Sequence, residues 1–77
     1  RSLYGLAHTV TFDVLRSGKR AVLVHDTENC CQKGITVFSL DEGTLDEVMR
    51  GEAGESEDLM IDRDAKGRLK KIRVVRE

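Results

Sequence analysis

The sequence contains no proline and few aromatic residues. Without proline, the chain has no rigid polyproline segment and no stiff linker between domains. Its three aromatic residues are Tyr4, Phe12 and Phe38. We expect Phe12 and Phe38 in the core, which leaves little aromatic material for a large ligand pocket.

Long apolar runs are also missing. No stretch approaches the roughly 20 apolar residues that a membrane helix needs, and nothing resembles a secretory signal peptide. We therefore expect no membrane among the partners of this chain.

The two cysteines, Cys30 and Cys31, are adjacent. Neighbouring Cα atoms lie about 3.8 Å apart across a trans peptide, whereas disulfide-bonded residues prefer roughly 4.4–6.8 Å. Since no other cysteine is present, the sequence excludes a disulfide framework. We expect a reducing compartment and therefore a cytoplasmic protein.

The length of 77 residues predicts one small domain over residues 1–77, because chains below about 100 residues rarely divide. A fold of this size buries about 60% of the surface that its unfolded chain exposes, so the core is thin. Charge is abundant but nearly balanced, with 13 basic and 14 acidic residues.

The first half of the chain predicts three β-strands. Between Tyr4 and Val14 the apolar residues occupy alternate positions, which is the period of a half-buried strand. RSGKR supplies a turn, and AVLVHD follows with apolar residues on both faces, as in a central strand. These segments predict a hairpin. Gly34 then precedes ITVFSL, a third strand that is apolar on both faces.

The segment TLDEVMR, residues 44–50, predicts a short helix. Thr44 and Glu47 fit a capping box, in which each side chain satisfies the other residue's backbone amide. Gly51 would end the helix in the left-handed conformation. The apolar residues that would share one helical face are Leu45, Val48 and Met49.

Residues 51–58, GEAGESED, predict a mobile acidic loop, and the segment after them predicts a second hairpin. Its turn is DAKG, with Gly67 in the left-handed position. Leu69 is out of phase with Ile72, which predicts a β-bulge at Lys70 and Lys71. The residues that share one face of this hairpin are Leu59, Ile61, Ile72 and Val74.

The expected element order is therefore β-β-β-α-β-β, and the expected fold class is α+β. It consists of a mostly antiparallel five-stranded sheet with one short helix. The same element order occurs in OB-folds, which are small curled barrels that often bind nucleic acids or other oligomers. This is an analogy of element order alone, and an open sheet covered by the helix fits equally well.

The proximity of His25, Cys30 and Cys31 allows three interpretations. With His8 they supply four zinc ligands, but adjacent cysteines diverge and no C-x-x-C pair is present. The two thiolates could also hold a softer metal ion. A catalytic thiol activated by His25 is the second interpretation. We favour the third, a small cysteine packed in apolar surroundings, and expect no cofactor.

Charge is segregated along the chain. Residues 41–64 have a net charge of −8, and residues 65–77 have a net charge of +5. This polarity favours association with a charged partner, although it also suits an acidic segment that folds beside its own basic strand. The basic residues that we predict to contact a partner are Arg68, Lys70, Lys71, Arg73 and Arg76.

The acidic segment is also a candidate for weak calcium binding, because several carboxylates in one flexible loop can surround a hard cation. The candidate ligands are Glu52, Glu55, Glu57 and Asp58. DRDAKG has the start of an EF-hand loop, but Lys66 and Arg73 occupy two of its ligand positions, so an EF-hand is rejected.

Among functions, non-catalytic binding to another protein or to a second copy is the hypothesis we favour. The binding surface would be the charged final hairpin or an unpaired sheet edge. The alternative is nucleic-acid binding by the basic last strand on an OB-like sheet, although the net charge of −1 argues against it. No phosphate loop, HExxH motif or nucleophile elbow is present, so we expect no enzyme.

Overall fold

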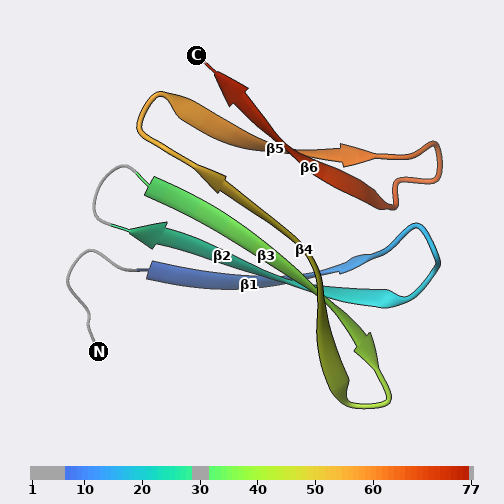
Figure 1. The fold of residues 1–77 in the computed structure, drawn as a ribbon. Helices are drawn as coiled ribbons and strands as arrows, with labels where there is room; N and C mark the ends of the chain where they lie inside the picture. The colour runs from blue at the N-terminus through green and yellow to red at the C-terminus, as the bar shows by residue number, and fades with distance from the viewer. Residues whose placement is uncertain (1–6, 29–31, 77) are drawn as a thin grey trace.

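The computed structural model describes residues 7–28 and 32–76. These residues form six strands in two antiparallel sheets (Figure 1). One sheet has the order β1-β2-β3-β4, and the other is the hairpin β5-β6. The strands are β1 (Ala7–Val14), β2 (Arg20–Glu28), β3 (Gln32–Asp41), β4 (Thr44–Ala53), β5 (Glu57–Arg63) and β6 (Leu69–Arg76).

The expected α+β fold class is wrong, because the described part of the chain is all-β and contains no helix. The five-stranded sheet is wrong as well, since the six strands divide into sheets of four and two. Without a helix after the third strand, the element order that suggested an OB-fold does not hold. The described ranges also hold no helix with the length and hydropathy required to cross a membrane.

The predicted first hairpin is confirmed. β1 and β2 pair antiparallel along all eight residues of β1. In the turn, the Leu15 N–H donates to the Lys19 carbonyl at 2.8 Å. Gly18 has a φ of 95°, a left-handed conformation that a residue without Cβ adopts readily. β2 lies between β1 and β3, so AVLVHD is the central strand that its two apolar faces predict.

The predicted helix at residues 44–50 is wrong, because this segment belongs to β4 and pairs antiparallel with β3. Glu42 and Gly43 have φ of 51° and 82°, so both central positions of a two-residue turn are left-handed. Such turns match the twist of a hairpin and reverse the chain between Asp41 and Thr44. Thr44 therefore begins a strand instead of capping a helix.

The apolar spacing that resembled a helical face has another origin. A β-bulge at Val48 shifts the β3–β4 register between Val37 and Phe38. The extra residue changes the phase of the alternation along β4. Leu45 and Met49 therefore point to opposite faces of the sheet, whereas four residues apart in a helix they would share one face.

The predicted final hairpin is confirmed, including its irregularity. β5 and β6 pair antiparallel, with Ile61 opposite Ile72. The register skips Lys70, which is the bulge that the phase of Leu69 and Ile72 predicts. Gly67 has a φ of 79°, as expected for the left-handed position of the turn.

The segment predicted as a mobile acidic loop is mostly strand, so this prediction is wrong. β4 continues to Ala53 and β5 begins at Glu57. Between them, the Glu57 N–H donates to the Gly54 carbonyl at 3.2 Å, and the Gly54 N–H donates to Glu57 Oε1 at 2.9 Å. These two bonds make the connection a tight turn.

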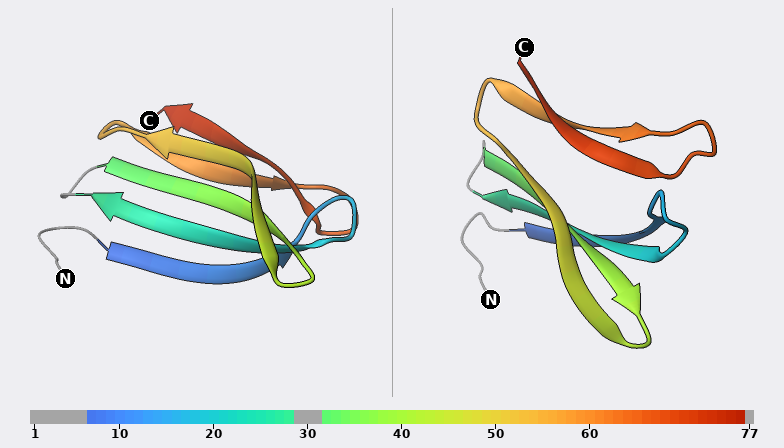
Figure 2. Two further views of the ribbon diagram at one scale, coloured as in Figure 1. Left: turned by 60° about the horizontal axis from the view of Figure 1, so that its bottom comes forward. Right: turned by 45° about the vertical axis from the view of Figure 1, so that its right-hand side comes forward.

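The β5–β6 hairpin lies over one face of the four-stranded sheet, which we call the inner face (Figure 2). The opposite face is the outer face. The core lies between the two layers, where Leu23, Val37 and Leu69 are fully buried and Ala21 and Ile35 are buried beside them. Burial of one leucine contributes about 1.5–3 kcal/mol, so Leu69 is the main apolar anchor of the hairpin.

Gly51 lies on the inner face of β4, beneath the hairpin. A Cβ at this position would lie 2.6 Å from Ile72 Cγ2 and 3.3 Å from Leu59 Cδ2. The glycine that was expected to end a helix instead lets the hairpin approach the backbone of β4.

We predict that Gly51→Ala destabilises the fold by about 1–3 kcal/mol, because the added methyl group overpacks the contact with Ile72. Gly34→Ala is the matched control, since its Cβ would meet the Gly51 carbonyl oxygen at an ordinary 3.7 Å. We expect this control to be neutral or stabilising by up to about 1 kcal/mol. Urea unfolding followed by circular dichroism measures both, and equal losses of stability would contradict the close approach.

Candidate functional site: the outer face and the β1 edge

The outer face carries a row of exposed apolar side chains on β1. Val10, Phe12 and Val14 are 54%, 77% and 40% exposed. The alternation along this strand was expected to mark its buried face, and Phe12 was expected in the core. Both expectations are wrong, because the opposite phase of β1, with Thr11 and Asp13, shares the inner face with the buried residues of β2.

The apolar row continues across the sheet. The register places Phe12, Val22 and Phe38 side by side on three neighbouring strands. Leu40 and Leu45 extend the row to the β3–β4 turn, where Leu45 is 51% exposed. We call this surface the apolar patch, and its members are Val10, Phe12, Val14, Val22, Val24, Phe38, Leu40 and Leu45.

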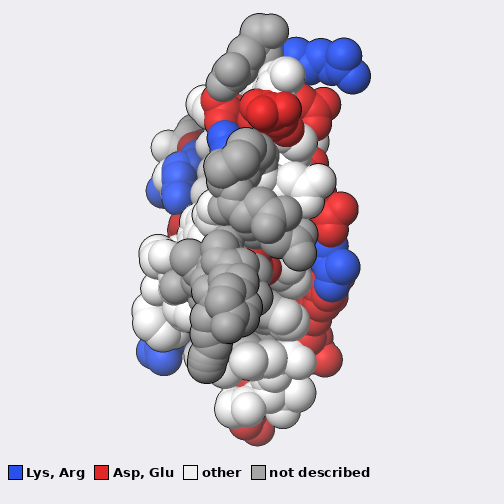
Figure 3. All heavy atoms as spheres, turned by 90° about the vertical axis from the view of Figure 1, so that its left-hand side faces the viewer, with Lys and Arg blue, Asp and Glu red and all other residues white. Residues whose placement is uncertain are grey.

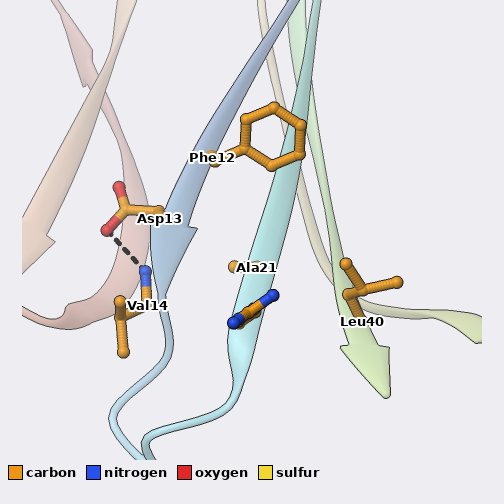
Figure 4. Close-up of a pocket in the computed structure, with 6 residues that line it drawn as sticks. Phe12, Asp13, Val14, Ala21 and Leu40 are labelled. Atoms are coloured by element: carbon orange, nitrogen blue, oxygen red, sulfur yellow. Dashed lines mark hydrogen bonds between the residues drawn. The ribbon is translucent and has the colours of Figure 1, made fainter. Parts of the chain in front are cut away.

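A hollow of about 440 Å³ lies at the end of the apolar patch where β1 ends and β2 begins (Figure 4). Phe12 and Asp13 point to opposite sides of β1 in this view. Small-molecule sites bury roughly 70–90% of their ligand, whereas Phe12 at the rim of this hollow is itself largely exposed. The hollow is therefore more open to solvent than a typical small-molecule site. Its lining residues are Phe12, Asp13, Val14, Arg20, Ala21 and Leu40.

Charged side chains occupy the β4 side of the outer face. Arg50 Nη2 and Glu47 Oε1 form an ion pair at 2.9 Å. Glu52 and Asp26 lie at the end away from the β3–β4 turn, beside a second hollow of about 190 Å³. The outer face thus combines the apolar patch with a strip of both charges.

β1 is an edge strand whose only charged side chain is Asp13, which points to the inner face and pairs with Arg63. Within the described residues it pairs with β2 alone, and its sequence AHTVTFDV contains no lysine, arginine or proline. Natural edges are usually protected by lysine, proline, bulges or short length. β6 carries four cationic residues in LKKIRVVR, and β4 carries a bulge and acidic residues. The remaining edge, β5, has four charged residues in EDLMIDR. β1 is therefore the edge strand with the fewest charged residues among the described strands.

The end of β1 is fixed to the hairpin by polar contacts. Arg63 donates to both carboxylate oxygens of Asp13, at 2.9 and 2.6 Å. This hydrogen bond with Arg63 holds the pKa of Asp13 below its ordinary value, against a smaller opposing effect of burial. A parallel bridge joins Leu15 to Leu69, and Arg68 Nη1 donates to the Arg16 carbonyl at 3.2 Å. The hairpin thus docks without covering the free edge of β1.

Part of the predicted basic row contacts other groups of the chain, while Arg73 and Arg76 stay exposed. Arg73 Nε donates to Asp62 Oδ2 at 2.6 Å, which lowers the pKa of Asp62. Arg76 Nε lies 3.7 Å from Glu57 Oε2. Together with the Arg68 bond described above, these contacts engage three of the five predicted residues. The other two, Lys70 and Lys71, are exposed at the bulge.

The four candidate calcium ligands are spread over a turn and two strands. Glu52 is exposed on β4 and Glu55 is exposed in the turn. Glu57 accepts the Gly54 amide, and Asp58 Oδ1 accepts a hydrogen bond from Lys33. Across residues 7–28 and 32–76, no group of three or more His, Cys, Asp or Glu side chains is placed to hold a metal ion.

Of the proposed metal or thiol cluster, His25 lies in the described part of the chain. Its Nε2 forms a hydrogen bond with Thr11 Oγ1 at 3.0 Å, between β2 and β1. Cys30 and Cys31 lie outside the described residues.

Charges that are segregated in the sequence mix in space. Acidic and basic side chains lie next to one another at the end of the molecule shown in Figure 3. The ion pairs Lys33–Asp58, Asp62–Arg73 and Glu57–Arg76 account for part of this mixing. The acidic segment therefore folds beside its own basic strand.

The apolar patch was missed from sequence, although one signal could have found it. β2 and β3 are apolar on both faces, a pattern typical of strands covered on both sides. One hairpin can cover one face, so the other face had to be left open.

Comparison with known proteins finds no matching family model, no matching curated protein and no matching solved structure.

We predict that the Asp13–Arg63 pair makes stability sensitive to acid. Because the pKa of Asp13 is lower in the folded state, the pair stabilises fully above the unfolded pKa of about 4 and is lost as pH falls through the folded value. Asp13→Asn should cost about 1 kcal/mol at pH 7 and flatten the pH dependence below about 4. Urea unfolding at several pH values measures this.

Asp41→Asn is the control for this prediction. Its carboxylate is exposed and lies 3.7 Å from Lys19 Nζ in a single contact. We expect its unfolding curve to follow the wild type at every pH. A wild-type profile that Asp13→Asn leaves unchanged would show that the bidentate pair does not contribute.

Proposed function

We propose that this chain is a non-catalytic protein-interaction module that binds an extended segment of a partner protein as an added strand along β1. The observation that carries this proposal is the eight-residue edge of β1, which lacks the lysines, prolines and bulges that protect natural edges and has one charged residue, Asp13. Strand addition is a common mode of peptide recognition, in which backbone hydrogen bonds supply affinity and alternate side chains supply specificity.

The side chains of β1 define the segment that fits. Val10, Phe12 and Val14 project from one face, so an added strand with apolar or β-branched residues at alternate positions would contact them. Each such cross-strand pair contributes roughly 0.2–1 kcal/mol. The partner segment should therefore have uncharged, apolar side chains at alternate positions, on the face that contacts Val10, Phe12 and Val14.

Other surfaces support a weaker case. In the final hairpin, Arg68, Arg73 and Arg76 contact groups of the same chain, which leaves less positive charge for an external partner. A nucleic acid would need a continuous basic surface beside exposed aromatics. The exposed ring of Phe12 instead shares its face with both acidic and basic side chains, among them the Glu47–Arg50 pair. The adjacent cysteine pair, which cannot form an ordinary disulfide, supports a cytoplasmic location.

We predict a specific amide-exchange pattern when a strand binds. The probe is an eight-residue peptide selected from a displayed library against the 77-residue chain. In an antiparallel or parallel ladder, every second amide of an edge strand points outward. Binding should therefore slow hydrogen exchange at alternate amides of residues 7–14 and leave β6 unchanged, as measured by amide NMR.

A pair of proline variants supplies the control. Because adjacent N–H groups point to opposite sides of a strand, one of Thr9→Pro and Val10→Pro removes an outward donor, and the other removes a bond to β2. The variant that loses the outward donor should keep most of the stability and lose peptide binding. The variant that loses a bond to β2 should lose stability. Lys70→Glu with Lys71→Glu should bind as wild type. Protection that maps to β6 instead would refute the proposal.

A further inference from the structure

The outer face has the apolar side chains of a sheet face that packs against another layer. Val22 is buried to 9% exposure on this face by its neighbours, whereas Val10, Phe12 and Leu45 around it remain about half exposed or more. Monomeric proteins rarely leave apolar patches larger than a few hundred Å², and such patches usually mark interaction sites. This surface shares Val10, Phe12 and Val14 with the strand-addition proposal but does not use the edge hydrogen bonds of β1, so the inference does not rest on that proposal.

We propose that a second copy of this chain covers the outer face and forms a face-to-face dimer. The two-fold axis would lie between the sheets and run perpendicular to the strands. Each strand then faces its own symmetry mate, which runs in the opposite direction. Packed sheets usually align within about 30° of each other, which this arrangement satisfies.

Two charges of β4, Glu47 and Arg50, are complementary under this operation, whereas Glu52 would face Leu45 of the other copy. Leu23 and Val37 are opposite each other in register and mark the centre. Glu47 pairs with Phe38, one residue from this centre toward the β3–β4 turn. Arg50 pairs with Thr36, one residue from the centre in the opposite direction. Reversal about the centre therefore brings Glu47 of each copy to Arg50 of the other. The existing intrachain pair would become a network of four charges.

The strand β2 has the same symmetry. Its outer-face residues follow the order Arg20, Val22, Val24, Asp26. Reversal about the centre places valine on valine in the middle and opposite charges at the two ends. On β1, Phe12 meets Val10 of the other copy. In an isologous interface each contact occurs twice, so these complementary levels reinforce one another.

The size of the face fits a weak dimer. Four strands spaced about 4.8 Å apart, each with seven or eight residues rising about 3.3 Å, present roughly 500 Å². Both copies together would bury on the order of 1,000 Å², which is the lower limit of specific interfaces. We therefore expect a Kd on the order of 1–100 μM. A purely apolar partner, such as a lipid surface, would leave the charged strip of β4 unpaired.

The first test is sedimentation equilibrium of the 77-residue chain in reducing buffer, over concentrations that span the expected Kd. A monomer–dimer equilibrium is expected. Phe12→Ser should weaken it by about tenfold or more, because the most exposed aromatic contact of the face is lost. Met60→Ser is the matched control, because Met60 is 47% exposed on the hairpin face that points away from the sheet. This control should dimerise as wild type.

The second test uses charge reversal, which changes exposed groups and leaves the core intact. Glu47→Arg alone and Arg50→Glu alone should each weaken self-association, because like charges would then meet across the two-fold axis. A mixture of the two variants should form a heterodimer, since each cross-contact again pairs opposite charges. Circular dichroism confirms that each variant is folded.

Several results would overturn the proposal. A wild-type chain that stays monomeric across the range removes it. So does a dimer that Phe12→Ser and Met60→Ser affect equally, or a mixture of the charge variants that fails to associate. Alternating amide protection along β1 on dimerisation would show edge pairing of two copies instead of face packing.

Discussion

The contact between the hairpin and the inner face is the constraint on which the rest of the structure depends. Leu69 is buried against Leu23 and Val37, and Ile72 packs directly over the backbone of Gly51. This packing supplies the second layer without which a four-stranded meander would have no core. It also decides which face of the sheet remains open, and hence where the proposed binding surfaces lie.

Polar contacts also hold the hairpin on the inner face of the four-stranded sheet. Arg63 reaches Asp13 at one end of the layer, and Lys33 reaches Asp58 at the other. Both pairs join segments that are far apart in sequence but adjacent in the two layers. Each pair takes one member, Arg63 or Asp58, from residues 41–64 and the other from the four-stranded sheet. Part of the charge in that stretch therefore joins the two layers.

The sequence was a good guide to strands and turns but a poor guide to layers. Alternation and turn glycines predicted both long hairpins, and the phase break at Lys70 located a bulge correctly. Residues 44–50 were misassigned because a second bulge, at Val48, imitates helical spacing, and because the turn at Glu42 and Gly43 lacks a familiar Asn-Gly signal. The exposed face of β1 could not be inferred, since alternation specifies that two faces differ and not which one is covered.

The two sheets share almost no hydrogen-bond ladder, since Leu15 and Leu69 form one isolated bridge between them. Lifting the hairpin away therefore breaks side-chain packing but spares nearly every backbone bond within each sheet. Such a unit separates at lower free energy than the whole domain unfolds. Departure of the residues after Ala53 would expose the core residues Leu23 and Val37 to water, and the four-stranded sheet would then be held by its hydrogen-bond ladders alone.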